Sequence, residues 1–190
     1  EAVAVWNGRI GAVGSTSDID AYRDGRTKVV DLKGRTVLPG LTDPHVHFAD
    51  GGASMMNRID CRDFYSNVRS IPQIVENIRI QAGRQPKGSW VIAHGSPMQD
   101  FRMPDKRFPN RHDLDAAAPD HPVSINFGAH ITIANSRALE LAGVRSGTAP
   151  PGGGAIEFDD AGEPTGKLVE RAQFLVKDIM PKYDYGQMKA

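Results

Sequence analysis

Two histidines separated by a single residue, His45 and His47, carry the strongest chemical signal in this sequence. On an extended backbone, residues i and i+2 point to the same face, so the two imidazoles would lie side by side, roughly 7 Å apart at the backbone. Two imidazoles aimed at one point are suited to hold a divalent metal at about 2 Å per bond. The spacing therefore favours a metal site over a structural pair of histidines.

The residues just before the pair support this interpretation. Pro44 has no N–H to donate to a sheet, so a central strand should end near it and leave the histidines at its C-terminal edge. In parallel α/β architectures, that edge is where catalytic groups gather. The carboxylate of Asp43 would accept a hydrogen bond from the second ring nitrogen of a metal-bound histidine, or else cap the end of the strand.

Three further residues could contribute to a site. His130 lies in a loop after an apolar segment, where it could contact substrate or metal, cap the next helix, or bond a backbone carbonyl. Glu170 lies where a strand is expected to change into a helix, and its carboxylate suits Zn²⁺, Mn²⁺ or Fe²⁺. The simpler interpretation of Glu170 is a first-turn residue that the helix dipole favours. Lys167, if carboxylated, is a rival bridging ligand.

The other histidines and the cysteine have simpler explanations. Cys61 lies among charged residues and is expected to be a surface or loop thiol rather than a nucleophile. His94 is expected to be structural, and His112 and His121 are expected to be solvated. A single cysteine excludes an internal disulfide and suits a reducing compartment, so we expect a cytoplasmic protein.

Composition and charge exclude several classes of protein. The chain has 190 residues, of which 39% are hydrophobic and 24% charged, as in ordinary soluble proteins. Its 23 basic and 23 acidic residues leave no net charge to attract nucleic acid or an anionic membrane. The longest apolar runs fall far below the ~20 residues that span a bilayer. We therefore expect a small-molecule substrate and no nucleic-acid or membrane partner, and a homo-oligomer stays open.

The spacing of apolar residues predicts an α/β protein with a β-rich beginning. The expected early strands are residues 2–6, 9–14, 29–32 and 36–38. The first two are expected to form a hairpin at Asn7-Gly8. The expected later strands are 90–93, 122–127 and the two arms of a hairpin within 155–168. The expected helices are 70–82, 134–142 and 169–180, the first with a capping box from Ser70 and Gln73. Both ends of the chain are expected to lie within a larger protein.

Longer motifs connect these residues. The run from Val30 to His47 contains Leu-Pro-Gly shortly before Asp-Pro-His-Val-His, and residues 2–14 precede it as paired apolar strands. Gly128-Ala-His130 is followed by Asn135-Ser-Arg-Ala-Leu, and a later motif runs from Gly162 to Glu170. Together these motifs resemble the amidohydrolase superfamily, and more narrowly its YtcJ-like branch, which includes N-substituted formamide deformylases.

The resemblance implies a fold and a division into domains. The fold would be a metal-dependent hydrolase (β/α)₈ TIM barrel, incomplete in this chain, with a small β-sandwich domain. Residues 1–38 would belong to the β-sandwich and residues 39–190 to the first part of the barrel, with an insertion at about 84–165. Since such a barrel alone takes about 250 residues, this chain should not close a barrel by itself.

The resemblance also implies a reaction: hydrolysis of an amide-type C–N bond, other than a peptide bond, by a metal-activated water. One or two divalent ions, with Zn²⁺ the first choice, would be bound. The site residues implied are the metal ligands His45, His47 and Glu170 and the substrate-binding residues His130 and Trp90. No catalytic residue is expected within this segment, because the catalytic Asp should lie beyond Ala190. The alternative is a non-catalytic or regulatory member of the fold, or an inactive fragment.

Replacing His45 by Ala tests the metal assignment. If the ring ligates the metal, the His45→Ala variant of the full-length protein should lose most of its metal and its activity, as measured by elemental analysis and a hydrolysis assay. His112→Ala, at a histidine expected to be solvated, is the control and should keep both. A His45→Ala protein with full metal and full activity would refute the assignment.

Overall fold

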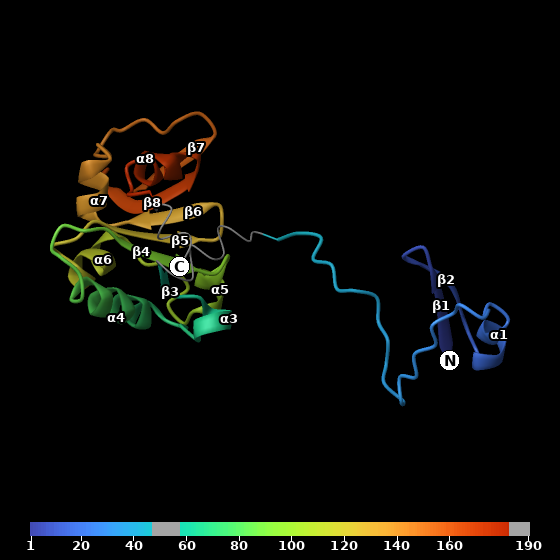
Figure 1. Ribbon diagram of the computed structural model, residues 1–190. Coiled ribbons are helices and arrows are strands. Elements are labelled where there is room, and N and C mark those ends of the chain that lie inside the picture. The colour runs from blue at the N-terminus through green and yellow to red at the C-terminus, as the bar shows by residue number, and fades with distance from the viewer. Residues whose placement is uncertain (47–57, 183–190) are drawn as a thin grey trace. The chain divides into compact units, whose positions relative to one another are not determined.

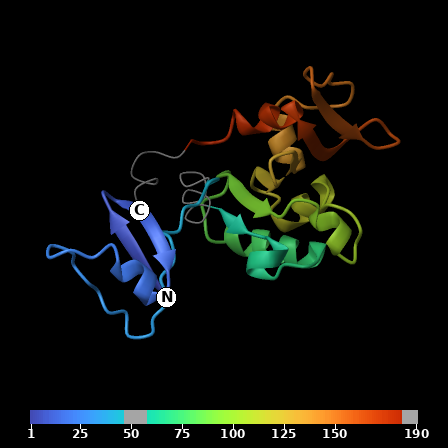
Figure 2. The same cartoon turned by 90° about the vertical axis from the view of Figure 1, so that its right-hand side faces the viewer.

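The computed structural model describes residues 1–46 and 58–182, and the chain divides into two compact units, Glu1–Pro44 and His45–Ala190 (Figures 1 and 2). The first unit begins with β1 (Ala2–Trp6) and β2 (Arg9–Gly14), which pair antiparallel as the sequence predicts. Asn7 and Gly8 connect them with φ values of 53° and 72°, the left-handed backbone that a two-residue hairpin turn requires. The following helix, α1 (Thr16–Asp20), begins at a capping box formed by Ser15 and Asp18.

After α1, the first unit differs from the sequence-based expectation. The strands expected at 29–32 and 36–38 do not form, and residues 21–46 contain turns and bends but no strand. Val30 and Leu38 are 64% and 71% exposed. A strand needs a hydrogen-bonded neighbour and a packed face, and the two-stranded sheet β1-β2 supplies neither to these segments. A β-sandwich is therefore not shown by the described residues, and the domain boundaries expected after residue 38 and around 84–165 stay predictions.

The second unit is built on one open sheet with the strand order β3-β4-β5-β6-β8-β7 (Figure 1). The strands are β3 (Ile59–Asp60), β4 (Val91–Gly95), β5 (Val123–Phe127), β6 (Ile131–Ala134), β7 (Gly154–Phe158) and β8 (Pro164–Glu170). The first three are parallel to one another, and each later pair is antiparallel. The α/β class is thus confirmed, while the sheet does not close into a barrel within the described residues.

Helices lie between strands of this sheet and after its last strand, β8. They are α3 (Asp63–Ser66), α4 (Ile71–Ala82), α5 (Gln99–Arg102), α6 (Arg111–Ala117), α7 (Ser136–Leu141), the 3₁₀ helix η1 (Arg171–Gln173) and α8 (Phe174–Lys177). The connection from β3 to β4 runs through α3 and α4, and that from β4 to β5 through α5 and α6. Parallel neighbours need such long crossovers, because a tight turn can join only antiparallel strands.

The helix α4 shows how local sequence determines an element. Ser70 accepts a hydrogen bond from the backbone of Gln73, as a helix cap does, and Ile74 and Ile78 are fully buried. The prediction of this helix is confirmed. The Gln73 side chain, however, accepts from the backbone N–H of Arg69 at 2.7 Å instead of from that of Ser70, so only half of the expected capping box forms.

Alternation along the strands gives the sheet two different faces. On one face, Val91, Ala93 and Ile125 pack with the buried side of α4 and with Leu114 of α6 in one apolar cluster. The opposite face carries His94, Asn126 and Thr132, which are register partners on β4, β5 and β6. This second face is therefore polar near the ends of the parallel strands.

A second apolar cluster covers the rest of the polar face. Leu168 of β8, the register partner of Thr132, packs there with Leu139 of α7 and Val176 of α8. The sheet is consequently buried on both sides across β5, β6 and β8, and its polar side chains must find hydrogen-bond partners inside the protein.

The C-terminal helix is shorter than the sequence predicts. The hairpin expected within 155–168 is confirmed as β7 and β8, but β8 extends to Glu170, and the helical region begins only at Arg171. The reason is tertiary: Val169 pairs with Ile131 of β6, and this pairing keeps residues 169–170 in the sheet. Helical structure then ends at Lys177 instead of residue 180.

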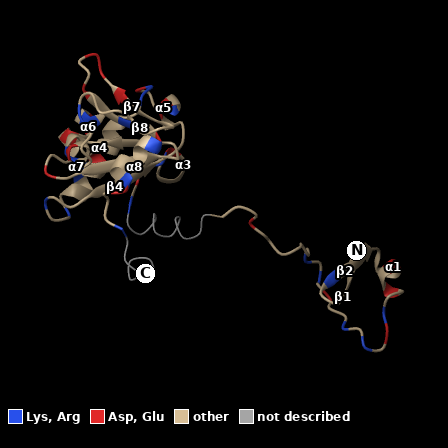
Figure 3. Ribbon diagram, turned by 90° about the horizontal axis from the view of Figure 1, so that it is seen from above, with Lys and Arg blue, Asp and Glu red and all other residues tan. Residues whose placement is uncertain are grey.

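Basic and acidic residues are interspersed along the ribbon, in agreement with the absence of a net charge (Figure 3). No helix within residues 1–46 and 58–182 combines the length and the apolar character needed to cross a membrane.

The core beneath α4 predicts a stability difference between two isoleucines of one helix. Ile78 is fully buried, whereas Ile80 is 43% exposed. Ile78→Ala should lower the free energy of unfolding by about 2–5 kcal/mol, because it leaves a cavity between α4 and the sheet. Ile80→Ala, the matched control, should cost less than about 1 kcal/mol. Urea unfolding measures both, and equal losses would contradict the packing described here.

Candidate functional site

The structure brings together two of the residues singled out from the sequence, His130 and Glu170. His130 immediately precedes β6 and Glu170 ends β8, and the antiparallel ladder between these strands pairs Ile131 with Val169. The backbone N–H of Glu170 donates to the carbonyl of His130 at 2.9 Å. The side chains also meet, with 2.8 Å between His130 Nδ1 and Glu170 Oε1. Both side chains are largely exposed, so the pair is open to a ligand.

The backbone at Glu170 is unusual. Its φ of 50° and ψ of −125° lie in a region that residues with a side chain rarely adopt. Such a conformation costs about 1–3 kcal/mol and is found mainly where the surroundings enforce it, commonly at functional sites. Gly154, the β7 partner of Glu170, approaches closely here, since a Cβ on Gly154 would lie 2.3 Å from the nitrogen of Ala172. The turn at Glu170 is therefore fixed from both neighbouring strands.

The pair offers the donor types that divalent metals bind. His130 can present its second ring nitrogen, Nε2, and Glu170 its second oxygen, Oε2, and imidazole and carboxylate are ligands of Zn²⁺ and similar ions. Within residues 1–46 and 58–182, no three His, Cys, Asp or Glu side chains gather to form a complete metal site. The donor chemistry thus fits a metal, and additional ligands are required.

Of the two predicted metal ligands His45 and His47, the structure describes only the first. His45 is exposed and lies in a bend, not at the end of a strand, and His47 lies outside the described residues. The strand expected to carry them is therefore not present over residues 36–46. Their role as metal ligands stays a prediction.

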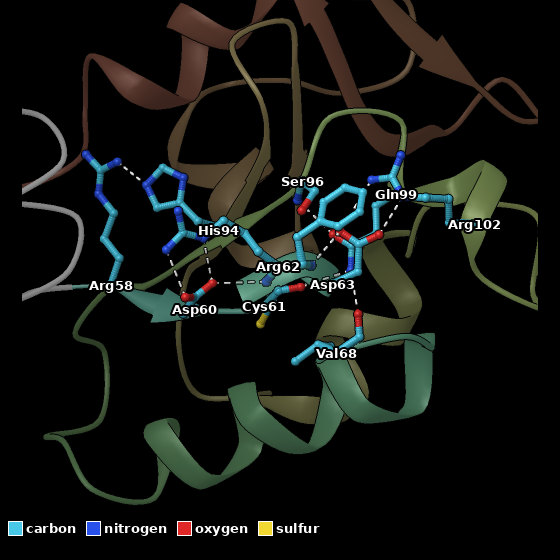
Figure 4. Close-up of polar contacts among 11 residues, drawn as sticks. Arg58, Asp60, Cys61, Arg62, Asp63, Val68, His94, Ser96, Gln99 and Arg102 are labelled. Atoms are coloured by element: carbon cyan, nitrogen blue, oxygen red, sulfur yellow. Dashed lines mark hydrogen bonds and ion pairs between the residues drawn. The ribbon is translucent and has the colours of Figure 1, made fainter. Parts of the chain in front are cut away.

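A second polar cluster surrounds His94, at the C-terminal ends of the parallel strands (Figure 4). Asp60 of β3 is the register partner of His94. The Arg62 side chain donates two hydrogen bonds of 2.8 Å to the Asp60 carboxylate. Arg58 contacts Nε2 of His94. Burial, and then the positive charges of Arg58 and Arg62, lower the pKa of His94 to about 4, so the ring is neutral at pH 7. The Arg62 hydrogen bonds lower the pKa of Asp60 to about 2.

This cluster is not among the sites that the sequence predicts. The sequence predicts a structural role for His94 and no role for Asp60 or Asn126. A usable signal was present for His94 and Asn126, because both lie near the C-terminal ends of short apolar segments and such ends share one edge of a parallel sheet. Asp60 follows a single apolar residue, Ile59, and gave no such signal. The sequence shows neither the short strand β3 nor that β3, β4 and β5 are neighbours.

A buried glutamine connects the loops beside this cluster. Gln99 donates from Nε2 to the carbonyls of Cys61 and Val68, both at 2.9 Å, and accepts from the N–H of Ser96 at 2.7 Å (Figure 4). It is fully buried. One side chain therefore holds together the loops that follow β3 and β4.

Two predictions about solvent exposure are wrong. Cys61 is fully buried in the core beneath α4, where burial raises the pKa of its thiol to about 12. The prediction relied on the charged residues next to Cys61 in the sequence. Successive side chains at a strand end point to opposite faces, so exposed neighbours do not imply that Cys61 is exposed. His121 is 4% exposed, with Nδ1 2.9 Å from the carbonyl of Ser89. His112 is exposed, as expected.

Trp90 has a packing role in this structure. It is half-buried against the second apolar cluster, and its carbonyl accepts a hydrogen bond from the Gln85 side chain at 3.1 Å. Lys167, the rival bridging ligand, donates to Glu157 at 2.9 Å. Substrate binding by Trp90 and His130 stays a prediction.

Comparison with known proteins gives consistent results. A family model described as "Amidohydrolase family" matches residues 28–190. N-substituted formamide deformylase of Arthrobacter pascens is 34% identical over 177 residues, covering 93% of this chain and 32% of that protein. The Bacillus subtilis (strain 168) protein YtcJ, named as an amidohydrolase, is 33% identical over 183 residues, covering 95% of this chain and 33% of that protein. The chain spans about a third of the length of these relatives.

A solved structure was also found. It is that of an uncharacterized metal-dependent hydrolase from Pyrococcus furiosus, 25% identical, with a TM-score of 0.47. The match covers 98% of this chain and 35% of that one.

The surroundings of His94 predict a pH dependence of stability. Its pKa of about 4 in the folded protein lies below the ordinary 6.5, so the unfolded chain takes up the proton first as pH falls. The free energy of unfolding should therefore fall by up to about 3 kcal/mol as the pH drops from about 6.5 to 4, and this contribution is fully present above pH 6.5. Asp60 acts only at lower pH, because its pKa is about 2.

Urea unfolding at several pH values measures this effect. His94→Gln should remove the part of the pH dependence between about pH 6.5 and 4, while His112→Gln, at an exposed histidine, should keep it. Identical stability profiles for His94→Gln and the unchanged protein would show that His94 is not held neutral by the fold.

Proposed function

Because the chain belongs to the amidohydrolase family, we propose that the full-length protein is a metal-dependent hydrolase that cleaves a C–N bond of a small amide-type molecule. Two relatives that match more than nine-tenths of this chain, a formamide deformylase and YtcJ, support hydrolysis of a C–N bond. Since the chain spans about a third of each, the activity is proposed for the full-length protein and not for these residues alone.

The single observation that carries the proposal is the pairing of His130 with Glu170. The two residues are 40 positions apart, yet their side chains meet at 2.8 Å on an exposed surface beside a strained backbone. Strain of this kind is retained where a precise orientation is needed. We propose that this orientation serves the reaction.

The proposed metal ligands are His45, His47 and Glu170, with Zn²⁺ the preferred ion. A divalent metal in such a site supplies Lewis acidity and an activated water. The part played by His130 follows from its geometry: the hydrogen bond to Glu170 fixes both the imidazole ring and the carboxylate. His130 would thereby orient the carboxylate and face the substrate, and Trp90 is proposed to line the substrate site.

The rest of the proposal concerns the full-length architecture. A (β/α)₈ barrel repeats a parallel strand followed by a helix, and β3, β4 and β5 with their helical crossovers fit this repeat. We propose that later strands complete a barrel. A small-molecule substrate and a cytoplasmic location, without nucleic-acid or membrane partners, belong to the same proposal, and a homo-oligomer stays open.

Replacing Glu170 by Gln in the full-length protein tests the function. The amide keeps the size of the side chain but loses the negative charge that a metal prefers, so bound metal and C–N hydrolysis should both fall by more than about 10-fold. Metal is measured by elemental analysis, and activity with a panel of N-substituted amides. Glu140→Gln, at an exposed position of α7, is the matched control.

Two results would contradict the proposal. One is a Glu170→Gln protein with unchanged metal content and unchanged hydrolysis. The other is an unaltered full-length protein that hydrolyses no member of the panel with Zn²⁺, Mn²⁺ or Fe²⁺ supplied, which would favour a non-catalytic member of the family.

A further inference from the structure

A buried amide side chain lies directly behind the His130–Glu170 pair. Gln173, in η1, is 2% exposed. Its Nε2 donates to the carbonyl of Ala129 at 2.9 Å and to the carbonyl of Glu170 at 3.0 Å. Ala129 is the residue before His130. One amide group therefore holds the backbone of both segments that carry the pair.

The other end of the amide is fixed as well. Lys177 donates from Nζ to Gln173 Oε1 at 2.8 Å, and Thr132 Oγ1 lies 3.0 Å from the same oxygen. Because an ammonium group only donates, Oε1 must face Lys177 and the NH₂ group must face the two carbonyls. The hydrogen-bond partners of Gln173 therefore determine the orientation of its amide group.

The bond to Glu170 acts where the backbone is strained. A residue with φ of 50° and ψ of −125° persists only if its surroundings hold it. Here the N–H of Glu170 is held by the His130 carbonyl and its own carbonyl by Gln173. Without the Gln173 donors, the peptide group after Glu170 keeps only the longer hydrogen bond from the Arg171 N–H to the Gly153 carbonyl, at 3.4 Å. We expect this peptide group then to relax toward a common conformation and the carboxylate to turn away from His130.

We propose that Gln173 is a positioning residue that holds His130 and Glu170 in register for the reaction. The role in the reaction rests on the proposed function, whereas the hydrogen bonds from Gln173 to the Ala129 and Glu170 carbonyls are a property of the fold. The competing explanation is that Gln173 only stabilises the core, as buried hydrogen-bonded side chains do.

A matched pair of substitutions separates these explanations. Gln99 is a second buried glutamine that donates to two carbonyls, but it connects the loops after β3 and β4. Gln173→Glu and Gln99→Glu make the same chemical change: each keeps the size and the acceptor and replaces two donors by an oxygen facing carbonyls. Both should lower the melting temperature, and only Gln173→Glu should change the site.

The first measurement is Co²⁺ binding to the full-length protein, followed by visible absorption. Gln173→Glu should weaken binding by about 10- to 100-fold and alter the absorption bands, as loss of a residue supporting a metal ligand does. Gln99→Glu should leave affinity and spectrum unchanged. An unchanged Co²⁺ affinity and spectrum in Gln173→Glu would overturn the proposal.

The second measurement does not depend on metal. The Glu170 N–H, bonded to the His130 carbonyl, should exchange with solvent at least about 10-fold faster in Gln173→Glu than in the unaltered protein or in Gln99→Glu. If the unaltered protein binds no Co²⁺, the proposed function fails, while this exchange rate still decides the role of Gln173. Equal exchange in all three proteins would overturn the positioning role. Should Gln173→Glu fail to fold, Gln173→Met removes the donors without adding charge and carries the same expectations.

Discussion

The antiparallel pairing of β6 with β8 is the constraint on which the candidate site depends. It sets Ile131 opposite Val169, and this register alone places His130 and Glu170 beside each other at the end of the ladder. A shift by one residue would turn every side chain of β8 to the other face and separate the pair. The buried Leu168 opposes such a shift, because it would have to leave the second apolar cluster.

Around this pairing, the sheet separates two tasks. The face toward α4 and α6 is apolar, and side chains such as Ile125 of the sheet and Ile74 of α4 pack in one cluster there and hold the unit together. The opposite face carries the polar row of His94, Asn126 and Thr132, which continues through Gln173 toward the site. Buried polar groups of this kind are stable only when they are hydrogen-bonded, so the row also limits the arrangements that the loops can adopt.

The sequence predicted elements whose cause is local. The helix α4 follows from apolar residues at helical spacing after Ser70, and the hairpin β1-β2 follows from Asn7-Gly8. The prediction was wrong for residues 29–32 and 36–38, where strand-like composition meets no neighbouring strand in this structure. It was also wrong for Cys61 and His121, because their burial depends on elements distant in sequence.

The motifs alone indicated the family, which the family model confirms, and they predicted a metal-dependent chemistry and singled out His130 and Glu170 as separate candidates. Only the tertiary structure decided that these two meet, that Glu170 ends a strand with a strained backbone instead of beginning a helix, and that Gln173 lies behind both. The physical reason is that strand pairing and burial join residues 40 or more positions apart, and neither composition nor spacing along a chain specifies which strands become neighbours.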